Sequence, residues 1–207
     1  MIRSAILIIT LLTINVLADD KIPDGFVMQV MEPTGGKILR PKGWFYFEGH
    51  RENSWMWTIS KEDTHGGRDS YDTGVRIQVF AGVQEGTGKS PEVFVKNFIA
   101  QKKKSSDKVH KNCDAVDQGL FTRTCIEVTE GDYRILYSAF WSNNTDIAII
   151  SIAGAKSVDW DANSKFFDTM STFELIDMER FSDDTKNKKG EQNAAEQPAA
   201  RLSSKPK

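Results

Sequence analysis

The chain has 207 residues, of which 27 are Lys or Arg and 29 are Asp or Glu, so its formal net charge at pH 7 is −2. This balance argues against a basic nucleic-acid-binding protein. The two cysteines are too few for a disulfide-dense miniprotein or a four-cysteine zinc ribbon. The length suits one domain with a single hydrophobic core and short appendages.

Residues 1–18 have the features of a secretory signal peptide. Arg3 supplies a positive charge, residues 5–17 are mainly apolar, and Val16 and Ala18 lie at the small-residue positions before a cleavage site. A membrane-spanning helix needs about 20 apolar residues. We therefore expect cleavage after Ala18 rather than an uncleaved anchor. Without a lipid-bearing cysteine or a transmembrane helix, the mature protein is predicted to be periplasmic or secreted.

The mature chain is predicted to begin with an N-terminal segment, residues 19–37, in which residues 26–31 favour a short strand. Residues 40–43 contain Pro and Gly and predict a turn. An aromatic strand is expected to start at Trp44, and residues 54–60 alternate in the manner of a second strand. These patterns indicate a β-rich first half.

Trp55 and Trp57 lie two positions apart on the second of these strands and so share one face of it. If a helix covers that face, both side chains belong to the core. If the face is open, they form an apolar platform for a ligand or a partner. We expect the core and keep the platform as a candidate surface.

A polar loop over residues 61–73 is the second candidate surface. Asp63, His65, Arg68 and Asp72 gather there around a Gly-Gly pair. Carboxylates are hard-cation ligands, but their spacing is not that of an EF-hand. We expect a solvated connection between strands, with a mobile recognition loop as the alternative.

A half-buried strand is predicted over residues 75–79, where apolar and polar residues alternate. The first helix is expected to start at Ser90, an N-cap residue that Pro and Glu follow. Lys102, Lys103 and Lys104 fall in its last turn, where positive charge suits the helix dipole. They are either a solvated helix end or a patch for anionic surfaces.

The two cysteines are predicted to form a disulfide. Cys113 and Cys125 flank a turn at residues 117–119, so a hairpin places them nearly opposite each other on neighbouring strands. An exported chain meets an oxidising compartment, in which such a pair is expected to oxidise. A structural staple is favoured over a redox switch, because no C-x-x-C motif is present.

The second half continues with strands over residues 133–141 and 147–153, the latter apolar on both faces and hence central. A helix capped by Ser157 or Asp159 is expected over residues 159–171, followed by a closing strand at 173–176. The fold class is α+β: a largely antiparallel sheet with two main helices. Residues 178–207 are polar and predicted to form a disordered tail.

Catalytic signatures are missing from the sequence. It contains no G-x-S-x-G, H-E-x-x-H, P-loop or G-x-G-x-x-G motif. His50, His65 and His110 lie in three separate segments and do not share metal-ligand spacing. We expect no metal, no cofactor and no catalytic residues.

Four groups of residues between positions 38 and 177 form one pattern: Pro41, Gly43 and Trp44; Ser90-Pro91-Glu92 with Phe94 and Phe98; the strands at 133–141 and 147–153; and Phe166, Phe167, Met170 and Phe173. With this pattern, residues 38–177 resemble the PsbP-like superfamily, and within it the bacterial DcrB-like envelope proteins. The resemblance implies an α+β sandwich and a small, non-enzymatic protein of the cell envelope.

The sequence thus predicts an exported binding or assembly factor of the bacterial envelope. Its partner is an envelope protein, a lipid or a small ligand, with peripheral membrane contact at the lysine patch. The alternatives are a metal-assisted enzyme that uses Asp63, His65 and Asp72, and a secreted effector or inhibitor that acts on a partner protein.

Overall fold

The computed structural model describes residues 22–51, 54–170 and 173–177. The predicted signal peptide and the predicted tail lie outside the described residues. The elements in chain order are β1 (Phe26–Met31), β2 (Gly35–Pro41), β3 (Phe45–Arg51), β4 (Ser54–Ser60), β5 (Gly74–Ala81), α1 (Val83–Thr87), α2 (Pro91–Ser105), β6 (Lys108–Asp117), β7 (Phe121–Glu130), β8 (Tyr133–Ser142), β9 (Ile147–Lys156), α3 (Trp160–Met170) and β10 (Phe173–Ile176).

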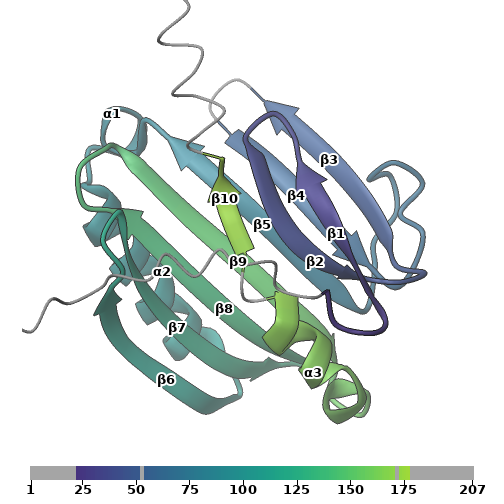
Figure 1. Ribbon diagram of the computed structural model, residues 1–207. Coiled ribbons are helices and arrows are strands. Elements are labelled where there is room, and N and C mark those ends of the chain that lie inside the picture. The colour runs from purple at the N-terminus through teal and green to yellow at the C-terminus, as the bar shows by residue number, and fades with distance from the viewer. Residues whose placement is uncertain (1–21, 52–53, 171–172, 178–207) are drawn as a thin grey trace, which may run out of the picture.

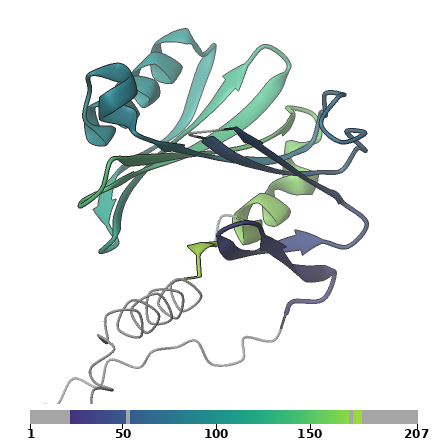
Figure 2. The same ribbon diagram turned by 90° about the horizontal axis from the view of Figure 1, so that it is seen from above.

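The strands form two antiparallel sheets, so the predicted α+β class is confirmed. The large sheet has seven strands in the order β3-β4-β5-β9-β8-β7-β6, and the small sheet has the order β1-β2-β10. Figure 1 shows the large sheet behind the small one, and Figure 2 shows α2 on one face of the large sheet with α3 and the small sheet on the other. The molecule is therefore layered as helix, large sheet, and small sheet with α3.

Short turns dictate this topology, because successive strands that a few residues join must pair antiparallel. The meander of β6, β7, β8 and β9 follows the predicted hairpins, with each strand paired to the next. β9 then pairs with β5 and closes the sheet at its centre. The prediction that residues 147–153 form a central strand is confirmed, because Ile149 packs on one face and Ile150 on the other.

Helix α2 forms where the sequence predicts it. The Ser90 side chain accepts a hydrogen bond from the Val93 amide (3.4 Å), and Pro91 occupies the first turn. Val95 is fully buried, and Phe94 and Phe98 pack beside it against β7, β8 and β9. The helix thus covers one half of its face of the large sheet and leaves β3 and β4 without a helix above them (Figure 2).

Two elements were not predicted. Helix α1 has only five residues, and its amides at Gln84 and Glu85 are capped by the Asp146 carboxylate from the β8–β9 turn. Strand β2 contains Gly35, Gly36 and Pro41, residues that are typical of turns. The predicted boundary between residues 37 and 38 falls within β2, so the N-terminal segment and the domain share the small sheet.

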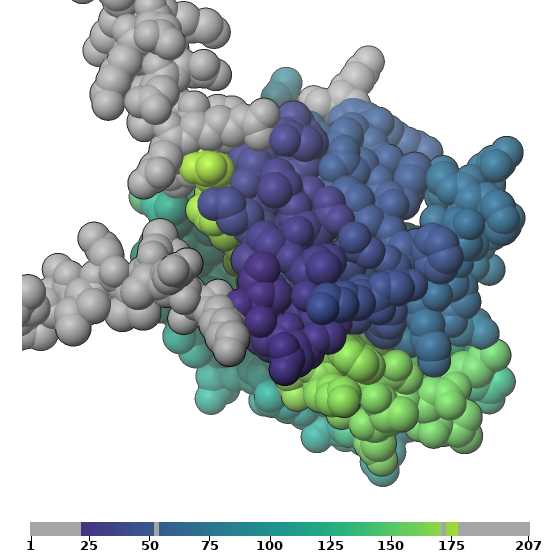
Figure 3. All heavy atoms as spheres, turned by 45° about the vertical axis from the view of Figure 1, so that its right-hand side comes forward, coloured from purple at the N-terminus to yellow at the C-terminus, as the bar shows by residue number. Residues whose placement is uncertain are grey.

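The main core lies between the two sheets and α3. Trp57 and Ile77 from the large sheet meet Met31 and Ile38 from the small sheet, and Phe167 from α3 completes the layer. The Trp57 indole also donates a hydrogen bond to the Glu32 carbonyl (2.7 Å), which joins β4 to the β1–β2 turn. Figure 3 shows the outer side of the small sheet, where β1 (purple) lies beside α3 (green) and where Met28 and Val30 are exposed.

Candidate functional site

The predicted disulfide is present. Cys113 in β6 and Cys125 in β7 are register partners whose Cα atoms are 4.9 Å apart. β6 is an edge strand of the large sheet, and register shifts interrupt its pairing on both sides of Cys113. The bridge therefore fixes the most irregular strand pair of the sheet. Its presence indicates an oxidising compartment.

The tryptophan face of β4 is covered. Trp57 is only 1% exposed, and Trp55 is half-buried against the main core. The His50 ring meets the Trp57 ring edge-on, with 5.8 Å between the centroids. The small sheet and α3 together cover this face, whereas the sequence suggested that a helix alone would do so. Trp55 and Trp57 accordingly lie in the core and present no open platform.

The loop at residues 61–73 is held by its own polar contacts. The His65 Nδ1 atom is 2.8 Å from an Asp69 carboxylate oxygen, and the His65 amide donates to Asp63 (2.7 Å). The Arg68 Nε donates to the His65 carbonyl (2.8 Å). Asp63, His65 and Arg68 thus form one exposed cluster at the tip of the loop.

Asp72 does not belong to that cluster. Its carboxylate accepts a hydrogen bond from the Tyr133 hydroxyl (2.5 Å) and lies 2.6 Å from the Lys156 ammonium. The hydrogen bonds from Lys156 and Tyr133 lower the pKa of Asp72. Asp72 therefore ties the base of the loop to the ends of β8 and β9. Across the described ranges, no three His, Cys, Asp or Glu side chains gather so as to hold a metal ion.

The three lysines at the end of α2 differ in their surroundings. The Lys102 ammonium is 3.2 Å from the Glu130 carboxylate and 4.5 Å from the centroid of the Tyr137 ring. Lys103 and Lys104 are exposed. Burial, followed by the charge of Glu130, raises the pKa of the Tyr137 phenol. Lys102 thus serves mainly to hold α2 against the sheet, and the candidate patch for anionic surfaces is reduced to its two exposed neighbours.

The structure also contains a cavity that the sequence did not reveal. It has a volume of about 550 Å³ and lies where β3, β4 and β5 are not covered by α2. Cavities of roughly 300–1,000 Å³ are typical of small-molecule sites. Its lining residues come from the three strands and the 61–73 loop: Phe47, Gly49, His50, Arg51, Ser54, Met56, Gly67, Arg76 and Gln78.

Two glycines allow close packing at the apolar wall of the cavity. Gly67 has a φ of +78°, and a Cβ atom there would overlap the Phe47 ring. A Cβ atom on Gly49 would lie 3.0 Å from the Met56 methyl group and 3.1 Å from the Phe47 ring. The loop can therefore approach Phe47 of β3 because Gly67 lacks a side chain, and Phe47 and Met56 pack over Gly49 because it lacks one as well. Gly67 is the contribution of the predicted recognition loop to this cavity.

The charged part of the cavity is positive. Arg51 and Arg76 are its two guanidinium groups, and none of the lining residues that the structure describes is acidic. The Arg76 Nε is shielded from solvent and is the one buried side-chain polar atom without a hydrogen-bond partner among the described residues. Burial raises the pKa of the neighbouring Tyr71 phenol, and the charge of Arg76 opposes this rise. The described wall of the cavity therefore takes its positive charge from Arg51 and Arg76.

The signal for this cavity was visible in the sequence but ambiguous. Arg76 and Gln78 are the polar residues of the alternating strand at 75–79, and a polar face of this kind is normally a solvated one. In the sheet they pair with Thr58 and Met56 of β4, so they share a face with the cavity. What alternation could not show is that the loop at Gly67 folds back over that face.

A second cavity of about 420 Å³ lies at the start of α2, between Ser90 and the β8–β9 turn. Its main polar groups already have partners within the protein. Asp146 caps α1, and Ser90 caps α2. It is therefore a weaker candidate than the cavity on β3–β5.

No protein-family profile and no curated protein matches this chain. Among solved structures, it is similar to the solution structure of cyanobacterial PsbP (CyanoP) from Synechocystis sp. PCC 6803, with 14% identity and a TM-score of 0.44. The match covers 73% of this chain and 93% of that one. This likeness is too distant to carry an argument about function. The similar solved structure is thus a PsbP, and the resemblance to DcrB-like proteins stays a prediction.

Proposed function

We propose that this protein is an exported, non-enzymatic binding protein of the bacterial cell envelope, and that its ligand site is the cavity on β3–β5. The observation that carries the proposal is the cavity itself: about 550 Å³ of mixed polar and apolar space on a regular sheet. Rigid strands that hold a preformed site keep the cost of ligand binding low. The site binds a ligand and has no part in transforming it.

Export is supported by two features of the chain. The first is the signal-peptide pattern of residues 1–18. The second is the disulfide between Cys113 and Cys125, which is expected to persist outside the cytosol. None of the helices among the described residues is long and apolar enough to cross a bilayer. Expression in a bacterial host, cell fractionation and mass spectrometry test this part: we expect envelope material that starts at Asp19 and contains no free thiol.

The site itself is tested with a fragment screen on the exported protein, read by backbone amide shifts in nuclear magnetic resonance spectra. We expect hits whose shifts concentrate in residues 47–51 and 74–80. Gly49→Leu fills the cavity, and Gly86→Leu is the matched control, because a Cβ atom on Gly86 meets nothing within 4 Å. The hits should persist in the control and disappear in Gly49→Leu.

Thermal unfolding of both variants checks that Gly49→Leu still folds. Hits that remain in a folded Gly49→Leu variant, or a complete lack of shifts in these strands, would contradict the proposed site.

A further inference from the structure

We propose that the corner of the molecule where α2 ends and β6 begins docks on a bilayer of anionic lipid. This docking corner consists of Lys103 and Lys104 of α2 with Lys108, Val109 and Lys111 of β6. The lysines of α2 suggested such a contact from the sequence, and the structure adds the edge strand of the large sheet to it. The docking corner is separate from the ligand cavity on β3–β5 and does not depend on the function proposed for that cavity.

The fold brings the lysines of both elements to the end of β7. Lys102, which directly precedes the two exposed lysines of α2, lies 3.2 Å from the Glu130 carboxylate. Thr129, the neighbour of Glu130, is the register partner of Lys108, and Lys111 follows on the same strand. β6 is an edge strand, so no further strand of the large sheet covers this side. The exposed lysines therefore stand around one rim of the sheet.

The four exposed lysines of the docking corner keep their charges free. None of their ammonium groups forms an ion pair with a residue in the ranges 22–51, 54–170 and 173–177. The neighbouring carboxylates are engaged elsewhere, because Glu130 binds Lys102 and Glu127 binds Arg134. The Asp107 carboxylate accepts a backbone amide of the β7–β8 turn (2.8 Å). The corner thus carries a local excess of positive charge in a chain whose net charge is −2.

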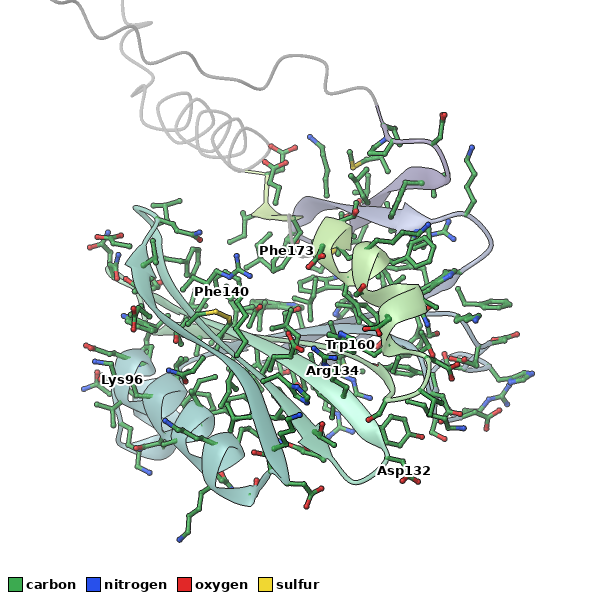
Figure 4. All side chains as sticks on the ribbon, turned by 90° about the horizontal axis from the view of Figure 1, so that it is seen from below. Lys96, Asp132, Arg134, Phe140, Trp160 and Phe173 are labelled. Atoms are coloured by element: carbon green, nitrogen blue, oxygen red, sulfur yellow. A yellow bond between two sulfur atoms is a disulfide. The ribbon has the colours of Figure 1, made fainter. Side chains whose placement is uncertain are left out.

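Two exposed acidic residues lie near the docking corner but outside it. Asp114 belongs to the second half of β6, beyond the disulfide at Cys113. The Asp132 carbonyl accepts the Ser157 amide (2.7 Å), so Asp132 lies toward the end of β9. Figure 4 shows Asp132 at the β7–β8 turn, apart from α2. The rim formed by α2 and the first half of β6 therefore stays positive.

A lipid surface fits this corner better than a single soluble anion does. Small ligands need donors that converge in a cavity. The lysines here are instead spread over a helix end and a strand edge, and none of them lines either cavity described above. Val109 is 38% exposed between Lys108 and Lys111, and apolar side chains beside lysines are typical of surfaces that enter the headgroup region. Each lysine near an anionic bilayer strengthens binding about fivefold.

The experiment measures flotation of the full exported chain with two kinds of vesicle, phosphatidylcholine alone and phosphatidylcholine with about one-third phosphatidylglycerol. We expect binding to the anionic vesicles only, and at least a tenfold loss when salt rises from ~0.05 M to ~0.5 M. Changing all four exposed lysines of the docking corner to glutamine should weaken binding at least tenfold. The matched control, which removes the same charge from other surfaces, should bind within about twofold of the wild type. It changes four other exposed lysines to glutamine: Lys42, Lys61, Lys89 and Lys165.

The apolar contact has its own pair of variants. Val109→Ser should weaken binding about threefold, because it removes the side chain that enters the headgroup region. Val158→Ser, at a valine that is 89% exposed outside the docking corner, should have no effect. If the four glutamines together prevent folding, Lys108→Gln with Lys111→Gln is compared instead with Lys42→Gln with Lys61→Gln.

Three results would overturn the docking corner. These are equal binding by the two sets of lysine variants, equal binding to neutral and anionic vesicles, and displacement of the protein from vesicles by millimolar glycerol phosphate. The last result would indicate a site for a single anion in place of a bilayer. Fragment hits in residues 47–51 and 74–80 should be unchanged in the lysine variant that folds, so failure of the docking corner and failure of the cavity are distinguished.

Discussion

Asp72 shows how a single carboxylate can set the pH dependence of a loop. Its pKa is lowered from the ordinary value of 3.8 by hydrogen bonds with Lys156 and Tyr133. A group with a lowered folded-state pKa stabilises the fold above its unfolded pKa, and that contribution is lost as the pH falls through the folded value. We expect Asp72→Asn to lower the urea midpoint by roughly 0.1–0.5 M at pH 7 and to have a shrinking effect below about pH 4.

The control for this prediction is Asp114→Asn, since the Asp114 side chain is exposed on the edge strand β6. It should leave the urea midpoint unchanged at both pH values. A difference between Asp72→Asn and the wild type that stays constant from pH 7 to pH 3 would rule out the carboxylate as its source.

At the scale of elements, the disulfide governs the edge of the large sheet. Cys113 and Cys125 are 12 residues apart and clamp β6, whose pairing with β7 is interrupted twice. Replacing both cysteines by alanine should lower the free energy of unfolding by about 3 kcal/mol, because the unfolded chain gains loop freedom. Hydrogen exchange should quicken in residues 108–117 and stay slow in the central strand β9.

Reductant provides the check on this prediction. Dithiothreitol should bring the wild type to the same stability as the double variant and should not affect the double variant. Equal exchange rates in β6 with and without the bridge would show that the register, not the disulfide, holds this edge.

The junction between β2 and β10 depends on one glycine. A Cβ atom on Gly36 would collide with the backbone carbonyl oxygens of Glu174 and Leu175. Backbone cannot move aside as a flexible side chain does, so Gly36→Ala should cost about 1–3 kcal/mol in urea unfolding. Gly86→Ala, the same chemical change in open space within α1, should be neutral or slightly stabilising. Similar losses in both variants would contradict this steric explanation.

Sequence patterns predicted elements with regular periodicity and local caps, such as α2 after Ser90 and the alternating β5. They did not predict elements that depend on distant partners. Helix α1 takes its cap from Asp146, which lies 62 residues from Gln84. The candidate cavity also depends on a distant partner. The sequence showed Arg76 as a polar residue of a strand, but it did not show that the 61–73 loop packs beside that strand face. Local propensity carries no information about such tertiary contacts.

At the scale of the whole molecule, the two sheets are joined into one structure. Figure 4 shows Phe140 of the large sheet and Phe173 of β10 pointing toward each other, with Arg134 beside Trp160 at the start of α3. The two phenylalanine rings meet edge-on at 5.8 Å, and the Arg134 guanidinium lies 5.0 Å from the centroid of the Trp160 ring. Since both sheets contribute to one core, we expect them to unfold in a single transition.

Trp57 tests this view of the molecule most directly. It lies in the shared core, 1% exposed, and its indole donates a hydrogen bond to the Glu32 carbonyl of the β1–β2 turn. Trp57→Phe keeps an aromatic ring but removes that bond, so the free energy of unfolding should fall by about 1–2 kcal/mol. Circular dichroism and fluorescence should still report one coincident urea transition, shifted to a lower midpoint.

Trp141→Phe is the matched control for this last prediction. Trp141 belongs to the cluster beneath α2, on the other face of the large sheet, and so has no part in joining the two sheets. A smaller loss is expected there, because only ring area is removed. If the small sheet were an independent unit, Trp57→Phe would split the transition into two steps, with the spectroscopic signal of β1 and β2 lost first. The expected result is instead a single urea transition with a lower midpoint in Trp57→Phe and a smaller shift of the midpoint in Trp141→Phe. That result would show that the hydrogen bond between Trp57 and Glu32 couples the unfolding of the two sheets.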